Sequence, residues 1–401
     1  MNSFWQSIPK PIVGLSPMDG VTDAAFRYIA ARHGGPDVTL TEFVNVVTAV
    51  HAPGNFIRDL TYSEIERPAV AQVYGHEPDL FYKVAHLVCE LGFDGLDINM
   101  GCPAKKVVGK GGGAALIRTP ALAASIIQSA RRGIQDWVQG QRLEALGLHP
   151  QLAERVRRAN LARSGTDTPT ERRLIPVSVK TRLGYDRVVV EDWIQALLEE
   201  KPRVISLHGR TLKQMYKGEA DWEAIGRAAA LARNSSSLIL GNGDLKDMGD
   251  VYRRVSETGV DGVLLGRSAL GNPWIFRGKN KMKTSPSSGA ARFPEQEEFP
   301  CVPLEERVQV ILEHCAHFEK YSGAPSFVGM RKHLAWYCKG FRGASEMRSR
   351  MVRANSAGDV ARCLQGLVPF NVDIPGVTGR PFPQASRFVP LAPFVPEPLL
   401  Q

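Results

Sequence analysis

The feature that most constrains the fold is a regular alternation of short β-rich runs with longer stretches of helical periodicity. Because βαβ crossovers cover both faces of a parallel sheet, the strands of such a sheet are apolar and show little polar alternation. Eight runs have this character, and they occupy residues 12–18, 38–44, 68–75, 95–101, 176–184, 204–210, 237–244 and 262–267. The alternation predicts an α/β protein that begins with a (β/α)8 TIM barrel.

Every run but the second ends in residues that a hydrophobic core would not select. These residues are Pro17, Met18, Asp19, Gln72, Asn99, Cys102, Lys180, Arg182, His208, Arg210, Asn242, Gly243, Asp244, Gly266 and Arg267. In parallel barrels the chemistry takes place at the carboxyl ends of the strands, which all open on one face. We therefore expect these residues to form one shared site.

The chain divides into parts of different character. An added segment, residues 139–173, carries one amphipathic helical pattern and then a basic loop rich in Ser, Thr, Gly and Pro. We interpret it as a surface insertion into a catalytic barrel that spans residues 1–277. Residues 278–300 are typical of a linker, 301–368 are predicted to form a small all-helical C-terminal domain, and 369–401 are a Pro-rich tail.

Composition and cysteine usage exclude several classes of protein. The 401 residues are 43% hydrophobic and 23% charged, an ordinary balance for a globular protein. No stretch approaches the roughly 20 consecutive apolar residues needed to span a bilayer, so no membrane partner is expected. Six cysteines without a CxxC pair indicate neither a disulfide framework nor a zinc site, and no metal is expected. We expect a cytoplasmic monomer without a protein partner.

The chain carries a net charge of +9, and much of the surplus is matched by one helical stretch. Residues 330–353 contain seven basic residues and one acidic residue, with Trp336, Tyr337 and Phe341 among them. This pattern favours a polyanion with unstacked bases, such as RNA. The alternative is a solvated helix face whose aromatic side chains lie in the core of the small domain.

Two loops of the predicted barrel indicate a phosphate site. The GNGD turn (241–244) and LLGR (264–267) follow the last two strands, where backbone amides and a guanidinium commonly bind phosphate; glycines that only make tight turns are the alternative. Lys180 is expected to point into the barrel mouth, where a buried ammonium needs an electron-rich partner. A flavin would provide one, with Gln72 and His208 beside it, although such residues are also common structural hydrogen-bonding groups.

Taken together, the motifs resemble those of the tRNA-dihydrouridine synthases, in the family's order and over nearly the whole chain. The matching segments are SPMDGVTD (16–23), AQVYG (71–75), DINMGCPAKKV (97–107), VKTRLG (179–184), LHGRT (207–211), GNGD (241–244), LLGRSALGNPWIF (264–276) and RKHLAWYCKGF (331–341). The insertion at 139–173 and the prolines after residue 369 depart from the family's pattern.

The resemblance implies a flavoenzyme that binds FMN in the barrel mouth, is reduced by NADPH and converts a uridine of the tRNA D-loop to 5,6-dihydrouridine. It implies hydride transfer from flavin N5 to C6 of the base and a proton from Cys102 to C5, with Asn99 and Arg182 holding the uracil. The positions that resemble the FMN-contacting set are Pro17, Met18, Asp19, Gln72, Lys180, His208, Asn242, Gly243, Asp244, Gly266 and Arg267. The helical domain would bind tRNA through Arg331, Lys332, Lys339 and Arg342.

The ordinary chemistry of a thiol agrees with the role of Cys102 as an acid. A thiol has a pKa of about 8.5, so it is mostly protonated near neutral pH. A nucleophile would need a lowered pKa and a nearby base; Lys105 and Lys106 could lower it, but we expect them to face phosphate or solvent. Two alternatives stay open. One is another FMN barrel acting on a small molecule, as a dihydroorotate dehydrogenase does, and the other is a tRNA-binding module without catalysis.

Overall fold

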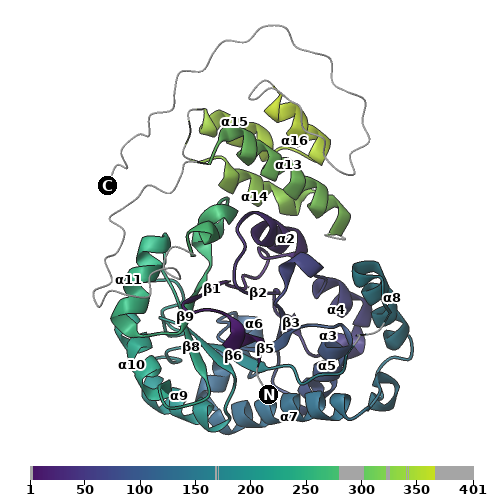
Figure 1. Cartoon of the computed structure of the whole chain (residues 1–401), viewed down its shortest axis with the longest axis vertical. Helices are drawn as coiled ribbons and strands as arrows, with labels where there is room; N and C mark the ends of the chain where they lie inside the picture. The colour runs from purple at the N-terminus through teal and green to yellow at the C-terminus, as the bar shows by residue number, and fades with distance from the viewer. Residues whose placement is uncertain are drawn as a thin grey trace. The chain divides into compact units, whose positions relative to one another are not determined.

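The structure is a computed structural model that describes residues 3–167, 169, 171–279, 302–321, 326–339, 341 and 343–365. Its first part is a closed barrel of parallel strands with helices around it (Figure 1). The strands are β1 (Ile12–Leu15), β2 (Thr39–Leu40), β3 (Val44–Asn45), β4 (Ala69–Tyr74), β5 (Gly95–Met100), β6 (Val177–Arg182), β7 (Val204–His208), β8 (Leu238–Asn242) and β9 (Gly262–Leu265). Because β1 pairs with both β9 and β2, and β2 pairs with β4, the sheet closes on itself. The predicted TIM barrel is confirmed.

The second strand of the barrel is interrupted. The sequence predicted one strand over residues 38–44, whereas the structure has β2 and β3, which both pair with β4. Between them Thr41 Oγ1 accepts a hydrogen bond from the amide of Gln72 (2.9 Å), so a side chain replaces a backbone carbonyl in the ladder. The next residue, Glu42, accepts a hydrogen bond from the amide of Val21 (2.9 Å). The interruption therefore brings a carboxylate to the strand end where we expected no polar residue.

Helices cover the outside of the barrel. They are α2 (Ala24–His33), α3 (Thr48–His51), α4 (Pro53–Asp59), α5 (Pro78–Glu90), α7 (Pro120–Val138), α9 (Val190–Glu199), α10 (Trp222–Ala232) and α11 (Met248–Thr258). The short helix α1 (Phe4–Ser7) packs on the barrel interior, and α6 (Lys105–Val108) lies in the loop after β5. The 3-10 turns are η1 (Glu64–Glu66), η2 (Gly113–Arg118), η4 (Arg267–Ala269) and η5 (Pro273–Lys279). Asp23, Asp221 and Asp247 cap α2, α10 and α11 by accepting a hydrogen bond from the amide three residues later. These caps fix where the helices begin, and so they fix the lengths of the loops after β1, β7 and β8.

The barrel interior is apolar at one end and polar at the other. Near the starts of the strands a buried cluster closes the barrel, and it consists of Trp5, Ile12, Val38, Leu40, Val70, Val204, Leu240 and Leu264. Toward the carboxyl ends of the strands the hydrogen-bonding side chains of Gln72, Asn99 and Lys180 take its place. The apolar cluster excludes water from the end of the barrel at which the strands begin. We call the open carboxyl end of the barrel the mouth.

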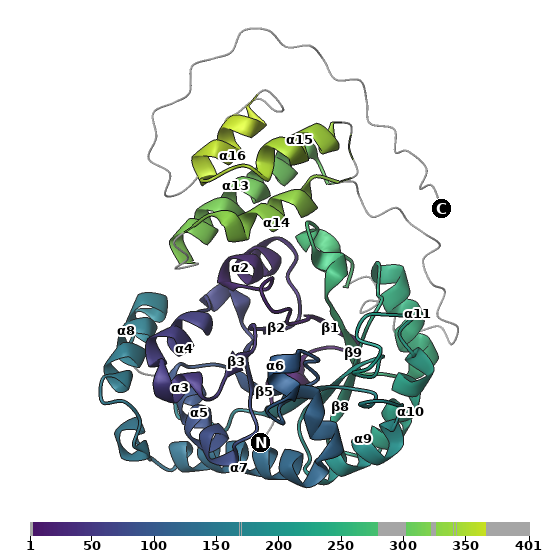
Figure 2. The same cartoon turned by 180° about the vertical axis from the view of Figure 1, so that it is seen from behind.

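The described part of the insertion holds one α-helix, and a 3-10 turn that was not predicted comes before it. It contains the turn η3 (Leu143–Leu146) and the helix α8 (Leu152–Ser164). Helix α8 lies beside α4 in both views (Figures 1 and 2). Asn160 Nδ2 donates a hydrogen bond to the carbonyl of Glu90 at the end of α5 (2.7 Å). These contacts attach the insertion to the outside of the barrel.

A second compact unit is helical, as the sequence predicted. It contains α13 (Leu304–Tyr321), α14 (Val328–Tyr337), α15 (Ala344–Met351) and α16 (Ala357–Leu364), and the contacts group residues 270–273 with it. The predicted linker beyond Lys279 and the predicted tail 369–401 lie outside the described residues. Across the described parts of the chain, none of the helices has the length and apolar character that a membrane span requires.

A buried ion pair ties α2 to η1 and provides a test of the fold. Arg27 and Glu66 are 1% and 2% exposed, and Arg27 Nε lies 2.7 Å from Glu66 Oε2. Removing one partner leaves the other charge buried without compensation, which costs about 3–5 kcal/mol. We expect Arg27→Met to lower the free energy of unfolding, measured by urea titration, by about that amount. The double variant Arg27→Met/Glu66→Leu should recover most of the loss, whereas a single variant as stable as the wild type would contradict this role.

Candidate active site

Cys102 lies in a short loop that follows β5 and is held by backbone contacts. Asn99 Oδ1 accepts hydrogen bonds from the amides of Gly101 (3.0 Å) and Cys102 (2.9 Å). The amide of Ala114 donates to the carbonyl of Cys102 (3.1 Å). Gly113 has φ +57°, and a Cβ there would lie 2.7 Å from that carbonyl, so only glycine fits. The loop therefore fixes the position of a thiol that is 8% exposed.

The surroundings of Cys102 favour the protonated thiol. Burial raises the pKa of Cys102 and outweighs the hydrogen bond from the Ala104 amide, while the carboxylate of Asp19 adds to the rise. Arg182 and Lys106 oppose it with smaller effects. A thiol with a raised pKa is a poor nucleophile near neutral pH and retains a proton to donate. The site is therefore suited to acid chemistry at Cys102.

A buried chain of hydrogen bonds crosses three neighbouring strands below the cysteine loop. Ser178 Oγ donates to Asp97 Oδ1 (2.6 Å), Gln72 Nε2 donates to Asp97 Oδ2 (2.7 Å), and Asn99 Nδ2 donates to Gln72 Oε1 (3.1 Å). Burial raises the pKa of Asp97 to about 6, against the lowering effects of Ser178, Gln72 and Lys180. The chain fixes which way the Gln72 and Asn99 amides face. Within the described residues each amide nitrogen donates this one hydrogen bond; Asn99 is 7% exposed and Gln72 is 0% exposed.

Lys180 holds a desolvated positive charge in the mouth. Its Nζ donates to Asn242 Oδ1 (3.2 Å), while Asn242 Nδ2 donates to the carbonyl of Leu264 (2.8 Å). Burial lowers the pKa of Lys180 to about 8, Arg182 lowers it further, and Asp97 opposes the shift. Because an amide oxygen compensates an ammonium only in part, an anionic or electron-rich ligand would be bound favourably here.

A cluster of cations surrounds His208 at the ends of β7 and β8. Burial lowers the pKa of His208 to about 2, and the charges of Lys180, Arg182, Arg210 and Arg267 lower it further, so the ring is neutral. Its Nε2 lies 3.4 Å from Arg210 Nη1; because the guanidinium can only donate, Nε2 accepts and the ring proton is on Nδ1. The mouth thus combines excess positive charge with a neutral donor, which suits a phosphate group.

Asp244 organises two of these cations. Its Oδ2 accepts from Arg210 Nη2 (2.6 Å) and its Oδ1 accepts from Arg267 Nη2 (2.7 Å). Although burial would raise the pKa of Asp244, the hydrogen bonds from Arg210 and the Ala220 amide lower it overall. Gly243 has φ +132°, and a Cβ there would lie 2.7 Å from the Ala220 side chain, so this turn must present bare backbone.

The end of β1 meets the end of β9 at the mouth. A Cβ on Gly266 would lie 3.4 Å from Met18 Sδ, and the amide of Met18 donates to Thr22 Oγ1 (2.9 Å). Pro17 is partly buried beside Met18, and Asp19 is exposed. These contacts bring the first strand end into the same site as the last.

Arg182 connects the cysteine loop to the loop after β7. Its Nε donates to the carbonyl of Gly101 (2.7 Å), and its Nη1 donates to the carbonyls of Thr211 (3.1 Å) and Met215 (3.0 Å). Tyr216 is 63% exposed and its ring centroid lies 5.9 Å from the guanidinium. Arg182 therefore positions two loops, and its Nη2 makes no hydrogen bond with the described residues.

Sequence reasoning missed three residues of this site. Asp97 could have been found, because it is a carboxylate inside an otherwise apolar strand. Glu42 follows the interrupted strand, and its pKa is raised to about 7 by burial and then by Asp23 and Asp19, against Arg27 and the Val21 amide. Neither this raised pKa nor the exposure of Tyr216 leaves a signal in periodicity, because both depend on how the loops at the strand ends fold.

The predicted tRNA-contacting residues belong to the helical unit. Arg331 Nε donates to the carbonyl of Ala354 (3.0 Å), so its guanidinium links α14 to the end of α15. Lys332 is partly buried and Lys339 is exposed, whereas Arg342 lies outside the described residues. Tyr337 is 1% exposed and lies in the core of this unit, which agrees for this residue with the alternative that the aromatic side chains are core residues.

Fold and site together define a barrel enzyme with an electropositive mouth and a protonated thiol at its rim. The profile of the family described as Dihydrouridine synthase (Dus) matches residues 14–139 and 157–369. The chain belongs to the dihydrouridine synthase family, and the resemblance seen in its motifs is confirmed.

Relatives from two bacteria are similar over most of their length. "Probable tRNA-dihydrouridine synthase 2" of Bacillus subtilis (strain 168) is 32% identical over 369 residues, which cover 90% of this chain and 95% of that protein. "Probable tRNA-dihydrouridine synthase" of Staphylococcus aureus (strain COL) is 32% identical, covering 90% of this chain and 94% of that protein. A solved DHODH from Eimeria tenella in complex with ferulenol is only 12% identical, with a TM-score of 0.43 over 66% of this chain and 78% of that one, which is too low to support an argument.

The charge on Lys180 gives a prediction for the ligand-free protein. Its pKa is about 8 in the folded protein, against about 10.4 in an unfolded chain, so folding desolvates a cation at neutral pH. The penalty is fully present below about pH 8 and fades as the pH rises toward about 10.4, because the folded protein then releases the proton first. We expect Lys180→Met to raise the free energy of unfolding at about pH 7 by on the order of 2–3 kcal/mol, with little gain near about pH 10.5.

Denaturant titrations at the two pH values measure this effect. The matched control is Lys213→Met, because Lys213 is an exposed lysine of the loop after β7 and its replacement should bring no gain. Equal or lower stability of Lys180→Met at neutral pH would show that the ammonium is not strained by burial.

Proposed function

We propose that this protein reduces the C5–C6 double bond of a uridine in tRNA to 5,6-dihydrouridine, with FMN as cofactor and NADPH as electron donor. The observation that carries the proposal is the protonated, immobilised thiol of Cys102 beside a mouth of desolvated cations. Membership of the dihydrouridine synthase family and the printed names of the relatives support the substrate. The monomeric state and the cytoplasmic location stay predictions.

The residues of the mouth fit the chemistry of FMN. The phosphate would be held by the backbone of the turns at Gly243 and Gly266 together with the exposed guanidinium of Arg267, and His208 lies beside Gly243. Lys180 would lie against the electron-rich edge of the ring, and Gln72 would offer its remaining amide proton. Bound FMN would supply the hydride for C6 of the uracil.

Cys102 would donate the proton to C5 of the uracil. Its raised pKa keeps the proton on sulfur until the base accepts it, and Asn99 fixes the loop through the amides of Gly101 and Cys102. Because Asn99 Oδ1 already accepts two hydrogen bonds, Asn99 would contact the uracil only through its remaining Nδ2 proton. Arg182 would contact it through Nη2. Both residues would therefore position the thiol as well as the base.

The helical unit would supply the affinity for RNA. A uridine inside folded tRNA must leave its stack to enter the barrel mouth. The free-energy cost of this unstacking would be offset by contacts between the tRNA and other parts of the protein. Lys339, Arg350 and Arg353 are exposed on this unit and are suited to phosphate contacts. Arg331 has a structural role through Ala354, so we assign it less weight than the sequence suggested.

The main prediction concerns the thiol. We expect Cys102→Ala to retain FMN and to oxidise NADPH, but to form dihydrouridine in tRNA at least about 100-fold more slowly, because a general acid commonly contributes a factor of about 100 to 10,000. Cys363→Ala, at a partly exposed cysteine of α16, is the matched control and should behave like the wild type. Wild-type rates from Cys102→Ala would remove the cysteine from the mechanism. Loss of FMN in that variant would assign it to cofactor binding instead.

A further prediction separates RNA contacts from structural arginines. We expect the triple variant Lys339→Ala/Arg350→Ala/Arg353→Ala to bind tRNA more weakly, with a shallower dependence of affinity on salt, because each phosphate contact releases a counterion. Flavin content and thermal stability should not change. The single variant Arg331→Ala should instead lower the stability of the helical unit. Unchanged tRNA affinity of the triple variant at moderate salt would show that these side chains do not bind the RNA.

A further inference from the structure

Asp97 is a buried carboxylate with no part in the chemistry proposed for the mouth. It is 0% exposed and lies in the middle of β5, in register with Gln72 of β4 and Ser178 of β6. Because the side chains of a strand alternate between its two faces, Asp97 lies on the same face of β5 as Asn99. Burial of a carboxylate is costly, so a structural or functional gain must offset it.

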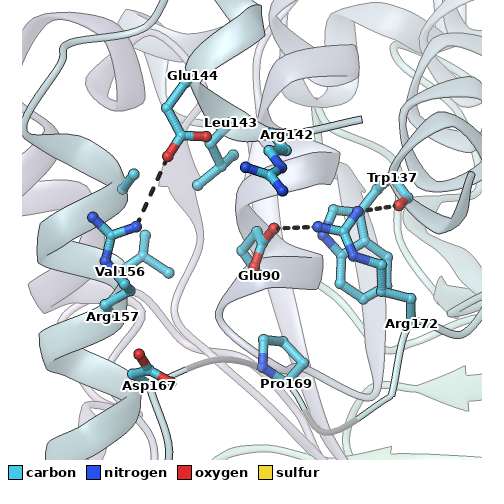
Figure 3. Close-up of a pocket in the computed structure, with 11 residues that line it drawn as sticks. Glu90, Trp137, Arg142, Leu143, Glu144, Val156, Arg157, Asp167, Pro169 and Arg172 are labelled. Atoms are coloured by element: carbon cyan, nitrogen blue, oxygen red, sulfur yellow. Dashed lines mark hydrogen bonds and ion pairs between the residues drawn. The ribbon is translucent and has the colours of Figure 1, made fainter. Parts of the chain in front are cut away.

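Ion pairing does not provide that gain. Two other carboxylates of the barrel unit with low exposure each face a guanidinium: Asp94, just before β5, is paired with Arg67 (2.9 Å), and Glu90 is paired with Arg172 (3.2 Å), which Figure 3 marks with a dashed line. Among the described residues, Asp97 makes no such ion pair. Its two oxygen atoms accept hydrogen bonds from a neutral hydroxyl (2.6 Å) and a neutral amide (2.7 Å). The direction of these hydrogen bonds is therefore the feature to explain.

The chain of hydrogen bonds that leads from Asp97 to the cysteine loop has a fixed direction at both ends. The amides of Gly101 and Cys102 can only donate, so Asn99 turns Oδ1 toward them. Asn99 Nδ2 then donates to Gln72 Oε1, and Gln72 Nε2 needs an acceptor in turn. An ionised carboxylate can only accept, and Asp97 therefore ends the chain with the one polarity that the cysteine loop requires.

We propose that Asp97 is a positioning residue for the proton donor, because it holds the loop of Cys102 through Gln72 and Asn99. The inference rests on the proposed function for the role of the thiol. Without an acceptor at position 97, the buried Nε2 of Gln72 would be unsatisfied and the amide would turn to find another partner. Asn99 would then lose the group that orients it, and the amides of the loop would lose their shared acceptor.

Two substitutions separate the direction of the hydrogen bonds from the charge. Asp97→Asn keeps an oxygen for Gln72 Nε2, and its own amide can donate to the hydroxyl of Ser178, which accepts as well as donates. The direction of the chain is preserved while the charge is removed. Asp97→Leu has a similar size but offers no acceptor, so it removes both.

The first measurement reports on the loop in the full-length, flavin-loaded protein. We expect iodoacetamide to alkylate Cys102 at least about tenfold faster in Asp97→Leu, because a released loop loses the burial that raises the pKa of the thiol. Hydrogen exchange at the amides of the loop should also be faster. Asp97→Asn should stay within about threefold of the wild type in both measurements. Asp94→Leu is the matched control at the start of the same strand and should alter stability without altering the alkylation of Cys102.

The second measurement concerns turnover and the route of the effect. We expect Asp97→Leu to lower kcat for dihydrouridine formation at least about tenfold, because a small misplacement of a reacting group can cost about 100-fold in rate. Asp97→Leu should have no further effect on alkylation when it is combined with Asn99→Ala, because the chain is already broken. If Asp97→Leu does not fold, Gln72→Met breaks the same chain with the carboxylate in place and should also speed alkylation.

Three results would overturn the inference. One is wild-type alkylation of Cys102 in Asp97→Leu or in Gln72→Met. Another is an Asp97→Asn variant as impaired as Asp97→Leu, which would assign Asp97 to balancing the charge of Lys180 instead. The third is a set of effects of Asp97→Leu and Asn99→Ala that multiply. Alkylation needs neither tRNA nor turnover, so these results leave the proposed function intact, whereas wild-type turnover by Cys102→Ala would remove the proposed mechanism alone.

Discussion

The positive charge desolvated at the carboxyl ends of the strands is the constraint on which the rest of the barrel depends. Burial lowers the pKa of Lys180, and burial together with the cations around it lowers the pKa of His208, so that the imidazole is neutral. Such an arrangement destabilises an empty mouth and favours a mouth filled by an anion. The apolar cluster around Trp5 closes the opposite end of the barrel to water, and its hydrophobic burial offsets the free-energy cost of the desolvated cations. Stability and binding are thus placed at different ends of one barrel.

The thiol is governed by the backbone rather than by a base. In a nucleophilic cysteine a neighbouring cation or histidine lowers the pKa, whereas the partners of Cys102 act mainly on its loop: Asn99 through two amides and Arg182 through the carbonyl of Gly101. The same Arg182 also binds the loop that carries Tyr216. A change at Arg182 would therefore move the thiol and the rim of the mouth together. Arg182 also lowers the pKa of Cys102, but burial outweighs that effect and the thiol keeps its proton.

The sequence was sufficient to predict the barrel and the strand ends, because both leave periodic signals: apolar runs at regular intervals, each followed by glycine or polar residues. It could not show which partner a side chain reaches. Gln72 was predicted as a free ligand for a cofactor, yet Asp97 and Asn99 take up most of its hydrogen bonds. Arg331 was predicted to contact RNA, and its hydrogen bond to the carbonyl of Ala354 could not be foreseen. The burial of Tyr337 agrees with the alternative that the aromatic side chains lie in the core of the small domain. Charge and aromatic content are visible in a sequence, whereas the direction of a side chain is a tertiary property.

The insertion lies at the end of the barrel opposite the mouth. Residues 139–173 join the end of α7 to the start of β6, so they lie among the loops at the amino ends of the strands. A change in length there leaves every loop of the mouth unaltered, whereas an insertion after β5 would displace the cysteine loop. Attachment through Asn160 and Glu90 involves the outer helices only. The insertion can therefore change without any change to the hydrogen bonds that hold Cys102.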